Sequence, residues 1–272
     1  MRLRSFAFSL VVLPCIFALP ASAQQTSTPV AQNPTAVTLA AKSIALLSGT
    51  VQIADITLTG TATRIAGSDT GSGTATLKAQ GTSSSRMDLS LSDGTFSEIR
   101  TSTSGAPQGQ WLAPNGAYNS MAMHNCFTDA AWFFPALTVL SQTSNPYLTI
   151  SYVGQATKNG IQVQHLHFAF TSAVSATSLA GLADPLVALS STDVYLDASS
   201  LLPVAFAFYT HPDNNSALNI PVEVDFSNYQ TVNGIQIPYH IQKFLNGSLY
   251  LDMTIQTAAL NSGLTISAFS SN

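Results

Sequence analysis

Charged residues are scarce in this sequence, since Asp, Glu, Lys and Arg make up only 8% of its 272 residues. Nine basic and thirteen acidic residues leave a formal net charge of −4 at pH 7. A nucleic-acid-binding protein needs a basic face, and docking on an anionic membrane needs a basic cluster. The composition argues against both classes and predicts a surface coated with Ser, Thr, Asn and Gln.

Cysteine is almost absent as well, with Cys15 and Cys126 as the two examples. Cys15 lies in a segment that we expect to be removed, so no intrachain disulfide can form in the remaining chain. Lipid modification of Cys15 is rejected, because Pro14 stands where a small residue is needed. A lone cysteine is more often a small buried residue than a reactive thiol, and this is the expectation for Cys126.

The N-terminus has the pattern of a cleavable export signal. Arg2 and Arg4 precede an apolar run over 6–19, and the small residues of 21–23 suit signal peptidase, so we expect cleavage after Ala23. The run is too short to span a bilayer comfortably, which argues against a retained anchor. We therefore expect a periplasmic or secreted protein with no stable membrane insertion after cleavage.

The remaining chain divides into a tether and one domain. Residues 24–35 are rich in Gln, Thr and Pro and predict a disordered tether, followed by a single folded domain over 36–272. An amphipathic helix is expected over 36–47, ending before Gly49. Its apolar positions are Val37, Ala40, Ala41, Ile44 and Leu47.

From residue 50 onward the apolar pattern has period two, as at Met87, Leu89 and Leu91. Such alternation predicts antiparallel strands with one buried face. Dipeptides that tolerate positive φ separate many of these runs and predict hairpins between consecutive strands. They are Asp93-Gly94, Asn115-Gly116, Asn159-Gly160, Asn233-Gly234 and Asn246-Gly247.

Two apolar segments interrupt the strand pattern. Residues 129–140 read as a helix despite Pro135, and residues 178–190 predict a loop with a helical turn. A curved sheet with one apolar face must cover that face. These two segments and the helix over 36–47 are the natural covers.

Short catalytic signatures are missing: the sequence has no GxSxG, HExxH, CxxC, GxxxxGK[ST] or GxGxxG motif. His165 and His167 would share one face of a strand and could both reach a metal ion, but no acidic residue adjoins them in sequence. Their simpler interpretation is a polar stripe. We expect no cofactor and no metal.

Two further pairs could carry chemistry. His124 lies near the Cys126 thiol, but a nucleophilic cysteine needs a cationic or helix-terminal environment that the sequence does not show. Glu223 and Asp225 share a strand face, where carboxylates are commonly just solvated. The segment 211–215 (HPDNN) reads as a turn. No catalytic residue is assigned, and we expect a protein that is not an enzyme.

The C-terminal third contains a distinctive series of segments: YLDASSLLP over 195–203, VDFSNY over 224–229, VNGIQIP over 232–238, ALN over 259–261, and Phe269. This series resembles the LolA/LolB-like lipoprotein-carrier superfamily of bacteria. The resemblance implies a strongly curved antiparallel half-barrel whose concave face is covered by a few helices, with an apolar cavity between. In terms of class this is a mainly β (α+β) fold.

The leading hypothesis is therefore an extracytoplasmic carrier that binds a hydrophobic small molecule or the acyl chains of a lipoprotein. The predicted ligand-binding residues belong to the apolar segment 129–140. They are Trp132, Phe133, Phe134, Leu137 and Leu140. The same side chains could instead fill the core, which would favour an envelope interaction domain. A hydrolase or metal-dependent enzyme is the third alternative, and the oligomeric state stays open.

Overall fold

The structure is a computed structural model, and it describes residues 32–103, 105–112, 116–172 and 184–271. The expected export signal, and the tether as far as residue 31, lie outside the described residues. The strands are β1 (Asp55–Ala66), β2 (Asp69–Gln80), β3 (Ser84–Leu91), β4 (Gly94–Thr103), β5 (Ala106–Leu112), β6 (Tyr118–Ser120), β7 (Leu148–Lys158), β8 (Ile161–Phe170), β9 (Thr192–Asp197), β10 (Pro203–Thr210), β11 (Ile220–Val232), β12 (Ile235–Leu245) and β13 (Ser248–Leu260). The helices are α1 (Pro34–Ser48), α2 (Pro185–Ser190) and the 3-10 turns η1 (Met123–Cys126), η2 (Pro135–Leu137), η3 (Val139–Gln142) and η4 (Ile266–Phe269).

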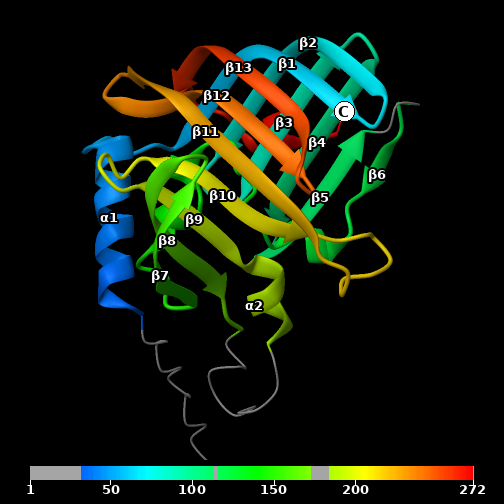
Figure 1. The fold of residues 1–272 in the computed structure, drawn as a ribbon. Helices are drawn as coiled ribbons and strands as arrows, with labels where there is room; N and C mark the ends of the chain where they lie inside the picture. Colours follow the sequence, from blue (N-terminus) through cyan, green and yellow to red (C-terminus); the bar gives the residue numbers. More distant parts are fainter. Residues whose placement is uncertain (1–31, 104, 113–115, 173–183, 272) are drawn as a thin grey trace, which may run out of the picture.

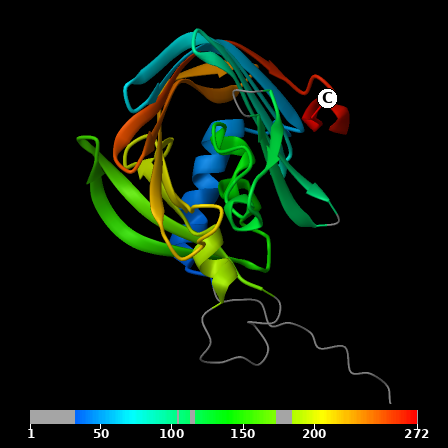
Figure 2. The ribbon, with the colours of Figure 1, turned by 90° about the vertical axis from the view of Figure 1, so that its right-hand side faces the viewer.

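In the described part of the chain, all strands join one antiparallel sheet of 13 strands, ordered β6-β5-β4-β3-β2-β1-β13-β12-β11-β10-β9-β8-β7. The sheet bends strongly around a hollow that holds α1 and the segment between β6 and β7 (Figures 1 and 2). This confirms the expected curved half-barrel, whose apolar face is covered by helical pieces.

The hairpin turns are set by asparagine and glycine. Asn159-Gly160, Asn233-Gly234 and Asn246-Gly247 all have positive φ at both positions, and each joins two paired strands. This geometry matches the right-handed twist of the flanking strands. Asp93-Gly94 joins β3 and β4 as expected, whereas Asn115 lies outside the described residues.

The topology makes the segment 121–147 a crossover. The chain builds the sheet outward from β1 to the edge strand β6, crosses to the opposite edge strand β7, and returns inward until β13 pairs with β1. Figure 2 shows the crossing segment, in green, lying inside the curve of the sheet beside α1. We call residues 121–147 the roof segment.

Helix α1 begins two residues before the predicted start. The Asn33 side chain caps it by accepting from the Ala36 N–H at 3.1 Å, so residues 32–35 belong to the folded part. It ends at Gly49, whose φ of 56° suits a residue without a side chain.

The buried face of α1 differs from the predicted one. Ala36, Ala40, Ser43 and Leu47 are buried, while Ala41 is exposed. The spacing of the buried residues is still helical. Most of them are small, because α1 lies close against the roof segment and β12. Apolarity alone could not reveal this rotation of the face.

The prediction of a helix over 129–140 was wrong. The structure has turns over 130–133 followed by the short η2 and η3. Pro135 lacks an N–H and its ring obstructs the preceding turn, so a continuous α-helix cannot run through it. The segment is nonetheless buried inside the sheet, as expected of a cover.

The third predicted cover is partly described. Residues 185–190 form α2, which contacts β8 at one end of the sheet, while 178–183 lie outside the described residues. Within the described chain, no helix has both the length and the apolar character needed to cross a membrane.

Candidate ligand cavity

A cavity of about 370 Å³ lies between the concave face of the sheet and the roof segment. We call it the sheet cavity. Its apolar wall comes from both halves of the sheet and from the roof segment. These apolar residues are Met87, Leu89, Phe96, Trp111, Leu112, Met121, Trp132, Phe208, Val222, Leu245 and Tyr250. Volumes of ~300–1,000 Å³ are typical of small-molecule sites.

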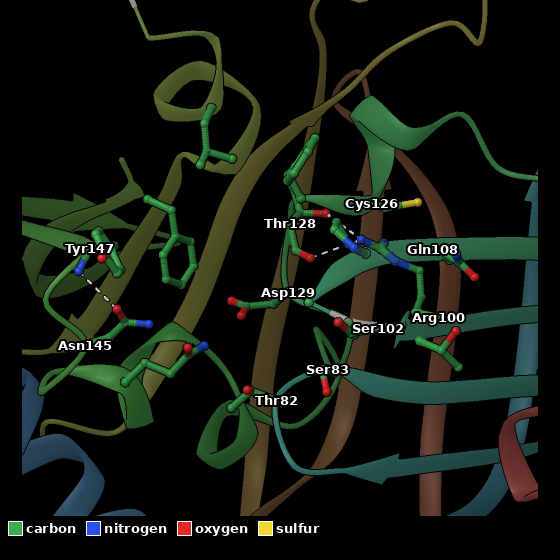
Figure 3. A pocket seen from close by; sticks show the side chains of 18 of the residues that line it. Thr82, Ser83, Arg100, Ser102, Gln108, Cys126, Thr128, Asp129, Asn145 and Tyr147 are labelled. Atoms are coloured by element: carbon green, nitrogen blue, oxygen red, sulfur yellow. Dashed lines mark hydrogen bonds between the residues drawn. The ribbon is translucent and has the colours of Figure 1, made fainter. Parts of the chain in front are cut away.

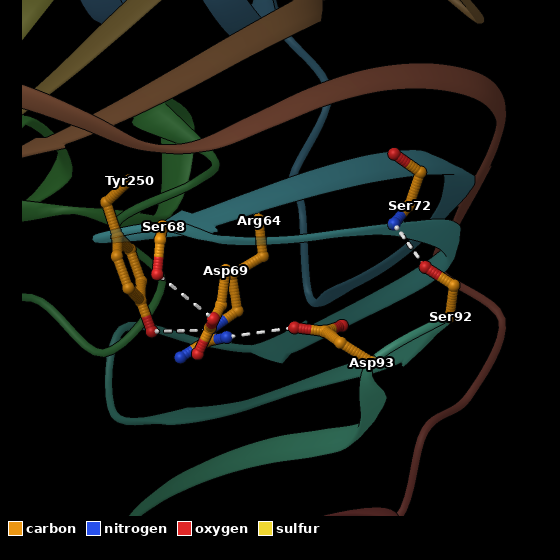
Figure 4. Close-up of polar contacts among 7 residues, drawn as sticks. All are labelled: Arg64, Ser68, Asp69, Ser72, Ser92, Asp93 and Tyr250. Carbon is orange, nitrogen blue, oxygen red and sulfur yellow. Dashed lines mark hydrogen bonds and ion pairs between the residues drawn. The ribbon is translucent and has the colours of Figure 1, made fainter.

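Arg64 lines one edge of the sheet cavity and contacts residues of three other strands or turns there (Figure 4). Its Nη1 pairs with Asp93 at 3.1 Å, its Nε donates to the Tyr250 hydroxyl at 3.3 Å, and its guanidinium lies 4.3 Å from the Phe96 ring centre. Gly71 makes this possible, because a Cβ there would lie 1.6 Å from the Asp93 carboxylate. The β1–β2 hairpin is thereby tied to the β3–β4 turn.

A second cavity, of about 560 Å³, adjoins the first. We call it the side cavity. Arg100 and Thr128 line both spaces. Arg100 is buried, and its Nη2 donates to the Thr128 carbonyl oxygen at 3.0 Å, while its Nη1 lies 3.8 Å from Glu98. This contact between β4 and the roof segment stands at the boundary of the two cavities.

Asp129 is the unusual group of the side cavity. One carboxylate oxygen accepts from the Val139 N–H at 3.0 Å, while the other is buried with no hydrogen-bond partner among the described residues. Figure 3 shows this side chain between Tyr147 and Arg100. Burial raises the pKa of Asp129 to about 7, against the opposing effects of Val139 and Arg100.

The five predicted ligand-binding residues are all buried beneath the sheet. Their exposed fractions are 2% for Trp132, 1% for Phe133, 0% for Phe134, 5% for Leu137 and 0% for Leu140. Among them only Trp132 lines either cavity, and its edge meets the Phe133 ring at a centroid distance of 5.7 Å. The other four pack into the core of the sheet.

The two histidines of β8 do find an acidic partner, one strand away. His165 Nε2 and His167 Nδ1 each lie 2.9 Å from the same Asp193 oxygen on β9, and the His165 ring stacks on Tyr195 at 4.4 Å. Burial would raise the pKa of Asp193, but these hydrogen bonds lower it below its ordinary value. Across the described residues, no three His, Cys, Asp or Glu side chains are arranged to hold a metal ion.

The pair His124 and Cys126 does not form a dyad. His124 Nε2 lies 3.1 Å from the Pro212 carbonyl oxygen, and the Cys126 thiol contacts the Ala122 carbonyl oxygen at 3.6 Å. Burial raises the pKa of the Cys126 thiol, which disfavours the thiolate. His124, and Asn125 bound to the His211 backbone, fasten η1 to the loop after β10.

Glu223 and Asp225 are more constrained than a solvated pair. Lys158 pairs with Glu223 at 2.5 Å, and Asn159 donates to Asp225 at 2.8 Å, so both carboxylates bind the β7–β8 turn. Burial and the neighbouring Glu223 raise the pKa of Asp225 to about 6. This arrangement fastens the β7–β8 hairpin to β11.

The functional groups that sequence reasoning missed are cations. Arg100 and Lys243 line the sheet cavity. A signal was present for Lys243, because it is in phase with the buried Ile237 and Ile241 of β12, so period two places a charge where the strand is otherwise mostly apolar. Arg100 gave no such signal, since it is in phase with Glu98 as well as Phe96.

No family model matches this chain, and a search of curated proteins finds no match. Solved structures do match over most of the chain. An outer membrane lipoprotein-sorting protein domain from Vibrio parahaemolyticus superposes with a TM-score of 0.53 at 12% identity, covering 86% of this chain and 96% of that one. A LolA superfamily protein from Nitrosomonas europaea gives 0.52 at 9% identity, covering 87% and 97%.

A DUF1329 family protein from Desulfovibrio piger gives a TM-score of 0.54 at 11% identity, covering 87% of this chain and 96% of that one. At these identities the similarity concerns the fold. The protein is thus an open half-barrel with helices on its concave face. Its fold is similar to that of the solved LolA superfamily protein, which confirms the resemblance seen in the C-terminal segments.

Proposed function

We propose that this protein is an extracytoplasmic carrier that binds a hydrophobic ligand non-covalently in the sheet cavity. The main support is the cavity itself, because strands from both halves of the sheet and Trp132 of the roof segment supply apolar side chains to one part of its wall. Burying apolar ligand surface there contributes ~25 cal/mol per Å² before the costs of association. One of the solved proteins with a similar fold is described as an outer membrane lipoprotein-sorting protein domain.

We propose that uptake and release involve a movement of the roof segment relative to the sheet. The Arg100–Thr128 hydrogen bond is one contact that such a movement would break, because Arg100 belongs to β4 and Thr128 to the roof segment. A ligand shifts this equilibrium only if it binds one arrangement better than the other. We therefore infer a binding and release cycle without covalent chemistry.

A carrier of this kind works outside the cytoplasm. The proposed cleavage after Ala23 predicts a mature chain beginning at Gln24. Mass measurement of the protein isolated from the periplasm or medium tests this directly. A full-length mass that includes Met1 would contradict the location that we propose.

The carrier function is tested with a neutral fluorescent probe, N-phenyl-1-naphthylamine, and by native mass spectrometry for co-purified lipid. Val222→Phe would fill the sheet cavity, because Val222 lines it and is 2% exposed. We expect about a tenfold or larger loss of probe affinity. Val153→Phe is the matched control on β7, since Val153 is 57% exposed and lines neither cavity.

Thermal unfolding checks that both variants remain folded. Undiminished probe binding by a folded Val222→Phe variant would exclude the sheet cavity as the binding site. If the wild-type protein neither takes up the probe nor carries lipid, the carrier proposal fails. The envelope interaction domain with a filled core would then be favoured.

A further inference from the structure

Lys243 brings a positive charge onto the inner face of the sheet. Its neighbours in register are Val224 on β11 and Leu251 on β13, both fully buried on the concave side. The ammonium nitrogen lies 4.2 Å from the centre of the Trp132 ring. A cation over an indole face is attracted by the ring quadrupole, so Trp132 holds the ammonium at the cavity wall.

This ammonium is the unpaired cation of the sheet cavity. Arg64 pairs with Asp93, and Arg100 is bound to Thr128 and lies near Glu98. Lys243 has neither an ion pair nor a hydrogen bond to any of the residues that the structure describes. Burial lowers the pKa of Lys243, while Glu98 raises it and Arg100 lowers it. The charged ammonium of Lys243 therefore lacks an anionic partner, and a ligand could supply one.

The carboxylates that line the same cavity do not fill this role. Glu98 lies 3.8 Å from the Arg100 guanidinium, which offsets its charge. Asp213 is on the exposed loop between β10 and β11 and makes no ion pair with a described residue. An anion entering the sheet cavity would therefore meet Lys243 as an available donor, since a charge shielded from water is favourable only when it is paired.

We propose that the carried ligand is a single-chain amphiphile whose anionic head, a carboxylate or a phosphate, binds Lys243 while its chain lies along the apolar wall. This inference rests on the carrier function proposed above. A cavity of about 370 Å³ is near the lower end of the range for ligand sites, which favours one chain over several. The chain would contact Met87, Leu89, Phe208 and Val222.

Displacement of N-phenyl-1-naphthylamine by four twelve-carbon compounds tests the head group. The compounds are dodecanoate, dodecyl phosphate, dodecanol and dodecyltrimethylammonium. We expect the anions to bind about tenfold or more tightly than the alcohol, because hydrogen bonds to charged groups are the strong ones. Comparison of carboxylate with phosphate separates the two sources of the anion.

Three variants assign the selectivity to one residue. Lys243→Met should reduce the affinity for the preferred anion about tenfold and leave the affinity for dodecanol unchanged. Lys243→Arg should retain the preference for anions over dodecanol. Lys42→Met is the matched control, since Lys42 is exposed on α1. Equal binding of dodecanol and both anions, or anion binding unaffected in Lys243→Met, would overturn the inference and leave the carrier function standing. No displacement by any compound, together with no uptake of the probe, would remove both.

Discussion

Arg100 donates to the Thr128 carbonyl oxygen at 3.0 Å, and these two residues stand between the sheet cavity and the side cavity. The bond joins the sheet to the roof segment. Nearby, Glu98 lies 3.8 Å from the same guanidinium. One buried side chain thus maintains a structural contact and balances a charge.

Arg100→Met should lower the free energy of unfolding by about 1.5–3 kcal/mol, because it removes charge-assisted hydrogen bonds and leaves Glu98 without its neighbour. Hydrogen exchange should also rise in the roof segment around Thr128. Arg100→Lys keeps the charge but loses the planar guanidinium, so it should recover only part of the stability. An Arg100→Met variant as stable as wild type would show that the contact does not hold the roof segment.

Of the five predicted ligand-binding residues, Trp132 lines the sheet cavity, and the other four line neither cavity and lie in the hydrophobic core. Phe134→Ala should destabilise the fold by about 3–5 kcal/mol, since Phe134 is fully buried and lines neither cavity. Trp132→Leu should instead weaken probe binding, because Trp132 lines the sheet cavity. Denaturant unfolding and probe titration on both variants check this division. A stable Phe134→Ala variant that has lost its probe affinity would contradict it.

The buried Asp129 predicts a pH-dependent stability. Its pKa is about 7 in the folded protein and 3.8 as a reference, so the folded state holds the proton more tightly. Its stabilising contribution is complete below about pH 4 and is lost as the pH rises through 7. The loss should be a few kcal/mol, ~4 at most.

Asp129→Asn should remove that decline, so the difference in unfolding free energy between variant and wild type should change steadily from pH 4 to 8. Asp225, whose pKa is about 6, acts in the same direction but is common to both proteins and cancels in the difference. Asp69→Asn is the control, because Asp69 is exposed. Parallel curves for Asp129→Asn and wild type would show that Asp129 titrates normally.

Gly71 offers a local test of the edge of the sheet cavity that Arg64 lines. Gly71→Ala should destabilise the protein by about 1 kcal/mol or more, although alanine ordinarily improves on glycine inside a strand. The reason is that a Cβ would lie 1.6 Å from the Asp93 carboxylate and displace it from Arg64. In an Asp93→Ala background the same change should be neutral or stabilising. An equal loss in both backgrounds would assign the effect to the backbone.

Local patterns predicted the sheet well, because its determinants are local. The alternation at Met87, Leu89 and Leu91 and the turns at Asn233-Gly234 and Asn246-Gly247 act over a few residues. The resemblance of the C-terminal segments then supplied the curvature. The crossover from β6 to β7 was not predicted, because pairing partners at the sheet edges are set by contacts distant in sequence.

The site was harder to predict for a related reason. Apolar density at 132–134 indicates burial, but whether a ring faces a cavity or the core depends on neighbours from several strands. The sequence shows that Arg100 and Lys243 are charged, but it does not show which residues surround them in the folded protein. Asp193 reaches His165 and His167 only through strand pairing.

The path of the roof segment has a mechanical consequence. It connects β6 and β7, the two free margins of the sheet, and passes through the hollow between them. Moving β6 and β7 apart would stretch the roof segment, because its two ends are attached to these strands. The curvature of the sheet and the extension of the roof segment are therefore linked. If the protein carries the ligand that we propose, the length of this segment limits how wide that ligand can be.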